Sequence, residues 1–164
     1  PQILSRLEKE SVETGHHYIE VTDYLRETVR SLNRIVEPAY DHVNNNHNPL
    51  NKFQGSSLKE LSHNTSVFLK EISHSLNSAN NESSLAINDK YYELLEQITK
   101  YRKKHLKNIK KEPGNTRTDM LFLDILSETK NIIHYSYEVN NSFHKFNVIN
   151  RDYLFHDISA PENE

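Results

Sequence analysis

The 164-residue chain has a formal net charge of −3 and no cysteine, which excludes disulfides, thiol catalysis and cysteine-based zinc sites and argues against a dedicated nucleic-acid binder. Its hydrophobic fraction of 35% is lean for a globular domain and favours long helices that each bury a single stripe. No apolar run approaches the roughly 20 residues that span a bilayer, so we expect a soluble protein.

Helical periodicity fills the segments between three expected breaks. Clusters of Gly, Pro, Asn and Ser predict these breaks near 48–56, 77–83 and 112–117. In the first segment, apolar side chains recur at spacings of 4 and 3, which predicts one face of a long helix turned toward the core. The members of this seam are Tyr18, Thr22, Leu25, Val29, Leu32, Val36, Ala39 and Val43.

The remaining segments predict three more helices. The second opens on Ser57-Leu58-Lys59-Glu60, a capping-box signature. The fourth is the richest in apolar residues, and Thr116 and Thr118 are its expected N-caps. We therefore predict an all-α fold, an up-down bundle of about four long helices over residues 1–150, followed by a fraying tail over 151–164.

A basic run ends the third segment. Apolar residues at helical spacing interrupt it, so it predicts a cationic helix face that could meet phosphate groups, lipid headgroups or an acidic partner; an ordinary solvated face is the alternative. The candidate residues are Arg102, Lys103, Lys104, Lys107, Lys110 and Lys111.

Two acidic groups are candidate metal sites. His16, Glu20, Asp23 and Glu27 stand at spacings of 4, 3 and 4, which can bring imidazole and carboxylates to one cation. Because this stripe lies nearly opposite the apolar seam, a solvated face is the competing interpretation.

The second acidic group lies in the fourth helix. Glu128 falls in a seam with Leu121, Ile125 and Ile132, so its carboxylate needs a partner. Two partners stay open: a metal with Asp124 as co-ligand and the first and second helices supplying the rest, or a lysine, from Lys130 or from the third helix. The sequence contains no Gly-rich phosphate loop, nucleophile elbow or His-Glu-x-x-His motif, and we expect no enzymatic activity.

Three segments together resemble a known family. The stretch 122–133, Phe-Leu-Asp-Ile-Leu-Ser-Glu-Thr-Lys-Asn-Ile-Ile, resembles the acidic helix of PhoU-like domains, although that helix has Glu before Asp. The stretches 18–27 and 37–47, and the basic run 101–111, resemble the cytosolic C-terminal domain of phosphate permeases of the Bacteroidetes type. The resemblance covers about two thirds of the chain.

The resemblance implies a regulatory domain of a membrane inorganic-phosphate transporter, on the cytoplasmic side of the bacterial inner membrane. Its partner would be the membrane-spanning part of the same polypeptide, and a homo-oligomer is left open. No cofactor is required, but a divalent metal or iron is implied through acidic motifs, of which Glu37 and Asp41 form the one strict Glu-x-x-x-Asp pair. A free-standing PhoU-like metal-binding protein and a generic helical interaction module are the alternatives.

Overall fold

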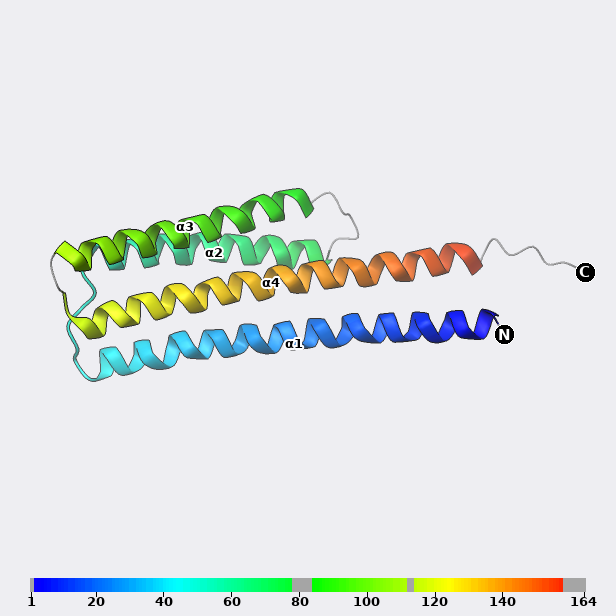
Figure 1. Cartoon of the computed structure of the whole chain (residues 1–164), viewed down its shortest axis with the longest axis horizontal. Helices are drawn as coiled ribbons and strands as arrows, with labels where there is room; N and C mark the ends of the chain where they lie inside the picture. Colours follow the sequence, from blue (N-terminus) through cyan, green and yellow to red (C-terminus); the bar gives the residue numbers. More distant parts are fainter. Residues whose placement is uncertain (1, 78–83, 112–113, 158–164) are drawn as a thin grey trace, which may run out of the picture.

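The computed structural model describes residues 2–77, 84–111 and 114–157, and these residues form four helices. The helices are α1 (Gln2–Asn44), α2 (Lys52–Asn77), α3 (Ser84–Lys111) and α4 (Thr116–Asp157). They run alternately up and down, and at the end of the bundle that holds the two chain termini α1 and α4 extend well beyond α2 and α3 (Figure 1). No strand occurs in the described residues, so the predicted all-α bundle of four helices is confirmed.

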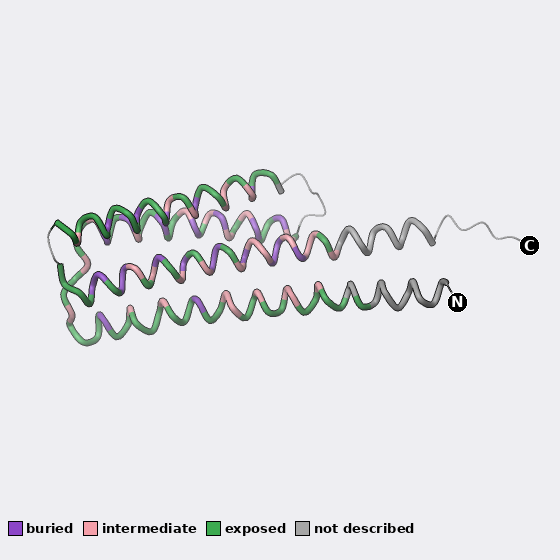
Figure 2. The backbone as a smooth tube through the Cα atoms, in the orientation of Figure 1, coloured by how far each residue is buried: buried purple, intermediate pink, exposed green. Residues whose placement is uncertain are grey.

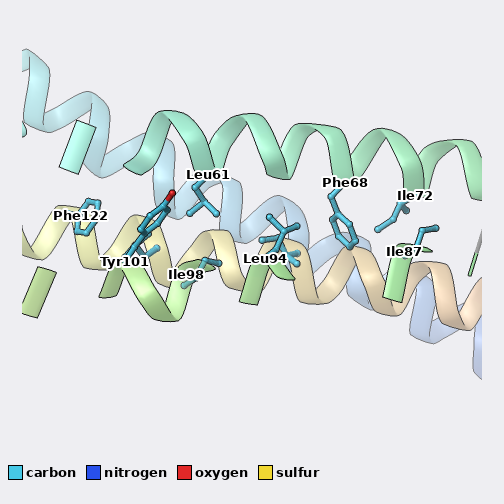
Figure 3. Close-up of a cluster of buried hydrophobic side chains, with 10 residues drawn as sticks. Leu61, Phe68, Ile72, Ile87, Leu94, Ile98, Tyr101 and Phe122 are labelled. Atoms are coloured by element: carbon cyan, nitrogen blue, oxygen red, sulfur yellow. The ribbon is translucent and has the colours of Figure 1, made fainter. Parts of the chain in front are cut away.

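The hydrophobic core lies between α2, α3 and α4. Phe68 of α2 and Phe122 and Ile133 of α4 are fully buried, and α3 contributes Ile87 and Leu94 (Figure 3). Along each helix, the buried residues of the whole core cluster recur at spacings of 3, 4 or 7, which keeps them on one face. The core is therefore a three-helix arrangement, to which none of the α1 side chains that the structure describes belongs.

Local signals fix the helix ends, though not all at the predicted residues. α2 begins at Lys52 rather than at Ser57, because Asn51 and Gln54 form a reciprocal capping box: each backbone N–H donates to the other's side-chain oxygen, at 2.8 and 2.9 Å. Asn115, rather than Thr116 or Thr118, caps α4. Its side-chain oxygen accepts hydrogen bonds from the backbone N–H groups of Arg117, at 3.0 Å, and Thr118, at 3.3 Å.

Helix α1 ends in a left-handed asparagine. Asn46 has φ 52°, a conformation that asparagine tolerates better than most residues. The N–H of Asn46 donates to the Val43 carbonyl and that of His47 to the His42 carbonyl, both at 3.1 Å. This is the Schellman arrangement that turns a chain out of a helix, and it starts the connection to α2. At the other end of the chain, α4 continues past the predicted boundary at Asn150 to Asp157.

The prediction for the inward face of α1 was wrong. The apolar seam is largely exposed: Leu25, Val29 and Val36 are each more than half accessible. Helix α1 packs on α4 and makes little contact with α2 or α3, and its outer face is green along the described length in Figure 2. The seam is exposed because the apolar side of α4 is already packed against α2 and α3.

A different face of α1 contacts α4. Ser31 is fully buried there, and its small side chain allows the two backbones to come close. The rings of Tyr24 and Tyr135 stack with centroids 6.3 Å apart, and Ser142 donates to Glu20 at 3.3 Å. The α1–α4 contact is thus mixed and polar, unlike the apolar contact of α4 with α2 and α3.

Removing a core side chain should destabilise the bundle sharply. Phe68→Ala leaves a cavity between three helices, and we expect a loss of about 3–5 kcal/mol in the free energy of unfolding. Urea denaturation followed by circular dichroism measures it. Leu85→Ala is the matched control, because Leu85 is 79% exposed and should change stability by less than about 0.5 kcal/mol. Equal losses in both variants would contradict the described core.

Candidate functional site

The last turns of α3 carry an exposed cationic surface. All six cationic residues predicted as a basic run are exposed, and within the described part of the chain none of them forms an ion pair. The Nζ atom of Lys104 lies 4.7 Å from the centre of the Phe53 ring, a cation–π distance. Leu106, 42% exposed, sits among these cations. We call Arg102, Lys103, Lys104, Lys107, Lys110 and Lys111 the basic surface.

A buried polar cluster lies beneath the basic surface. His105 of α3 is 1% exposed, and its Nε2 atom lies 3.4 Å from Oδ1 of Asp119 in α4. Gln54 of α2 donates to the same oxygen at 2.9 Å. The His105 ring packs edge-on against the Phe122 ring, with the ring centroids 4.6 Å apart. The cluster links three helices at the end of the bundle that carries the basic surface.

Asp119 of this cluster also lies close to Gly114, shortly before α4 begins. A Cβ atom added at Gly114 would lie 3.0 Å from Oδ2 of Asp119, tighter than an ordinary contact, so a residue without a side chain suits this position. Sequence analysis did not select Gln54, His105 or Asp119 as a group. Their separation in the sequence gave no signal that the three would meet.

A polar pocket of about 660 Å³ opens between the end of α1 and the start of α4. Its lining includes Asp41 and Asp124, both predicted metal ligands, beside His42, His47 and Arg117. The Arg117 guanidinium contacts the His47 ring. Partial desolvation, followed by the charge of Arg117 and the nearby His42, lowers the pKa of His47. Because both helices contribute a carboxylate and α4 also contributes a guanidinium, the pocket has no single sign of charge.

The acidic stripe of α1 makes local ion pairs. Glu20 lies 2.9 Å from Nδ1 of His17 and 3.3 Å from Nε2 of His16. Asp23 lies 3.0 Å from Arg26, and Glu27 pairs with Arg30. Each carboxylate therefore has a cationic or imidazole partner three or four residues away on the same helix.

Glu128 has a partner on another helix, as its seam position required. That partner is Arg34 of α1, with Nη1 3.8 Å from the carboxylate, rather than Lys130 or a lysine of α3. Asn131 also donates to Glu128, at 3.2 Å. Asp124 lies instead on the polar pocket, and Glu37 is exposed on α1.

The structure does not bring the predicted metal ligands together. They fall into four places: the α1 stripe, the pocket lining, the Arg34–Glu128 contact and the exposed surface of α1 at Glu37. Among the described residues, no group of three or more His, Asp or Glu side chains is arranged to hold a metal ion. The spacing that suggested a shared cation is satisfied instead by side chains of opposite charge nearby.

Comparisons with protein-family models, with curated proteins and with solved structures find no match to this chain. No helix in the described residues has both the length and the apolar character to cross a bilayer. The case for a function therefore depends on the surfaces of the bundle itself and on the sequence motifs.

Neutralising Glu128 should weaken the bundle slightly and leave metal content unchanged. In Glu128→Gln, the contact with Arg34 loses its charge, and because Arg34 is 58% exposed we expect a loss of at most about 1 kcal/mol by urea denaturation. Arg34→Ala should remove the same contribution, so the double variant should lose no more than the larger single loss. A melting temperature of the parent that falls in EDTA would favour a metal at Glu128 instead.

The lowered pKa of Glu20 should make the stability of the fold depend on pH in the acidic range. The hydrogen bond from His17 is the main cause that lowers the pKa of Glu20 below its ordinary 4.5. A lowered pKa in the folded state stabilises the fold above the unfolded pKa, and this contribution disappears as pH falls through the folded pKa. The stability difference between the parent and Glu20→Gln should be present near pH 6 and shrink towards about pH 3. A difference that stays constant over this range would refute the assignment.

Proposed function

We propose that this chain is the cytosolic regulatory domain of a membrane inorganic-phosphate transporter, and that it acts through contacts with its partners rather than through chemistry of its own. The observation that carries the proposal is the basic surface, which faces solvent at one end of the bundle. The assignment to a phosphate transporter is supported by the resemblance of three sequence segments to PhoU-like domains of phosphate permeases.

The basic surface suits a contact with anionic lipid or with an acidic loop beside the membrane. Each cation near an anionic bilayer contributes on the order of 1 kcal/mol, and the attraction acts within a Debye length. Lys110 and Lys111 lie in the last turn of α3, where they also complement the helix dipole. The other four cations lie before that turn, so the dipole does not account for them. Leu106 supplies an apolar contact in their midst.

The position of the basic surface supports a regulatory role. It stands above the His105–Asp119–Gln54 cluster, where α2, α3 and α4 are joined by buried polar contacts. A contact made at this end would therefore be transmitted to three helices at once. The proposal places the membrane-spanning partner in the same polypeptide, so that binding at this surface is an intramolecular event with a high effective concentration.

Charge reversal at the basic surface should abolish lipid binding. The triple variant Lys103→Glu, Lys104→Glu, Lys107→Glu should bind phosphatidylserine-containing vesicles at least about tenfold more weakly than the parent in a cosedimentation assay. The parent's own binding should fall as salt is raised. Lys59, Lys70 and Lys130 are exposed lysines elsewhere, and their reversal to Glu is the matched control. Equal binding by both triple variants and the parent would leave the basic surface as a solvated face.

The transporter role is tested separately in cells. Phosphate uptake by the full-length polypeptide should change when the basic surface is reversed and stay at the parent level when the control lysines are reversed. Both variants should reach the membrane in equal amounts, as judged by immunoblot. Parent-level uptake in the basic-surface variant would refute regulation through this surface, whatever the vesicle assay shows.

A further inference from the structure

The exposed face of α1 is an unusually long apolar stripe. Six of the large apolar side chains on it are between 46% and 74% exposed: Tyr18, Leu25, Val29, Leu32, Val36 and Val43. They follow one another along the helix at spacings that are sums of 3 and 4, so they form one continuous line. Scattered exposed apolar residues are normal on a protein surface, but a line of this length is not.

The stripe follows a strict heptad. If Val29, Val36 and Val43 are given position a, Leu25 and Leu32 fall at position d. β-Branched residues at a combined with leucine at d favour parallel two-stranded coiled coils. Thr22 and Ala39 occupy the remaining a and d positions between residues 22 and 43, and both are small enough to be accommodated in such a seam.

Charges are placed away from this seam. Of the seven charged residues between 22 and 43, six fall at positions b and f, on the flanks farthest from the seam. Arg26 alone falls at an e position, and the opposing g position of a parallel partner would be Val21. No pair of like charges would therefore meet across two copies of the helix.

The area of the stripe is sufficient for a dimer. Ile19 and Tyr40, 60% and 66% exposed, border the six stripe residues at e positions. Eight side chains that each expose roughly 100 Å² amount to roughly 800 Å² per copy, which is the size that a stable interface takes from each partner. A surface of this extent left in water would also exceed the apolar patches usual on a monomer.

A neighbouring groove extends the apolar surface. Because α1 packs mainly on α4, a groove of about 550 Å³ remains between α1, α2 and α4. Leu32 belongs to both the stripe and the groove, and Ile35, Leu58, Leu69 and Ile125 continue the lining. The apolar surface therefore does not stop at the edge of α1, and a helix laid on the stripe would border this groove as well.

We infer that the stripe of α1 is the dimer interface of this protein, formed by two copies of α1 packed in parallel with Val29, Val36 and Val43 facing their own symmetry mates. A two-fold axis lets the same heptad serve both sides, so one sequence pattern is complementary to itself. The inference does not depend on the proposed function, because the stripe on α1 lies on the opposite side of the bundle from α3 and its basic surface. Dimerisation through the stripe also needs no membrane.

A membrane surface fits the stripe less well than a second copy. Helices that lie on bilayers carry Lys and Arg along the flanks of the apolar face. Between residues 22 and 43, α1 carries four carboxylates against three arginines, and of these charges only Arg26 lies beside the stripe, so the stripe lacks the cationic flanks that anionic headgroups favour. Lipid binding that is lost only when the stripe is changed is the outcome that would favour the membrane.

Sedimentation equilibrium tests the dimer directly. At micromolar concentration the parent should have twice the chain mass of 19.3 kDa, and Val29→Glu/Val36→Glu should sediment as a monomer, with a dissociation constant raised at least about 100-fold by two buried charges in each copy. Leu85→Glu/Met120→Glu, which changes two equally exposed apolar residues elsewhere, should remain dimeric. Helical content by circular dichroism should be the same in all three proteins.

Single cysteines test the orientation, because the chain has none of its own. In a parallel seam residue 22 meets its own symmetry mate, so Thr22→Cys should form an intermolecular disulfide under mild oxidation. Glu37→Cys, on the outer flank, should not. A monomeric parent, a dimeric Val29→Glu/Val36→Glu variant, or a dimer in which Thr22→Cys fails to cross-link would each overturn the proposed interface.

Discussion

The bundle depends on α4 packing against other helices through two of its faces. Phe122, Leu126 and Ile133 pack into the apolar core with α2 and α3, while Glu128 and Tyr135, on another side of the same helix, meet α1. A helix that is covered on several sides must be apolar or internally paired around most of its circumference. This explains why the fourth segment is the richest in apolar residues and why its half-buried Glu128 is paired with an arginine of α1.

The polar contact between α1 and α4 determines which face of α1 remains in water. Tyr24 and Arg34 pair with groups on α4 and Ser31 is buried against it, whereas Leu25 and Val29 lie on the exposed side of α1. A buried small residue with flanking polar pairs positions a helix without much hydrophobic area. The heptad stripe is thus free for an intermolecular contact, and the basic surface on α3 lies at a separate place where it could be used at the same time.

Electrostatic pairing also accounts for the acidic residues that suggested metal binding. Glu20, Asp23 and Glu27 each have a cationic or imidazole neighbour within one helical turn, and an exposed pair of this kind is worth only a few tenths of a kcal/mol. The i, i+3 and i, i+4 spacings that can assemble a metal site are the same spacings that assemble ion pairs. Residue type and spacing alone do not distinguish a metal site from a set of ion pairs, because the difference depends on which side chains the neighbouring helix places beside the carboxylates.

The sequence by itself determined the four helices and the exposed cations of α3, since periodicity and charge act within a few residues of one another. It also determined that Glu128 would need a partner. Only the tertiary structure decided that this partner is Arg34, that Gln54, His105 and Asp119 meet, and that the heptad of α1 faces outward. An amphipathic pattern shows that a helix has an apolar face, but which neighbour covers that face depends on how residues far apart in the chain fill the core.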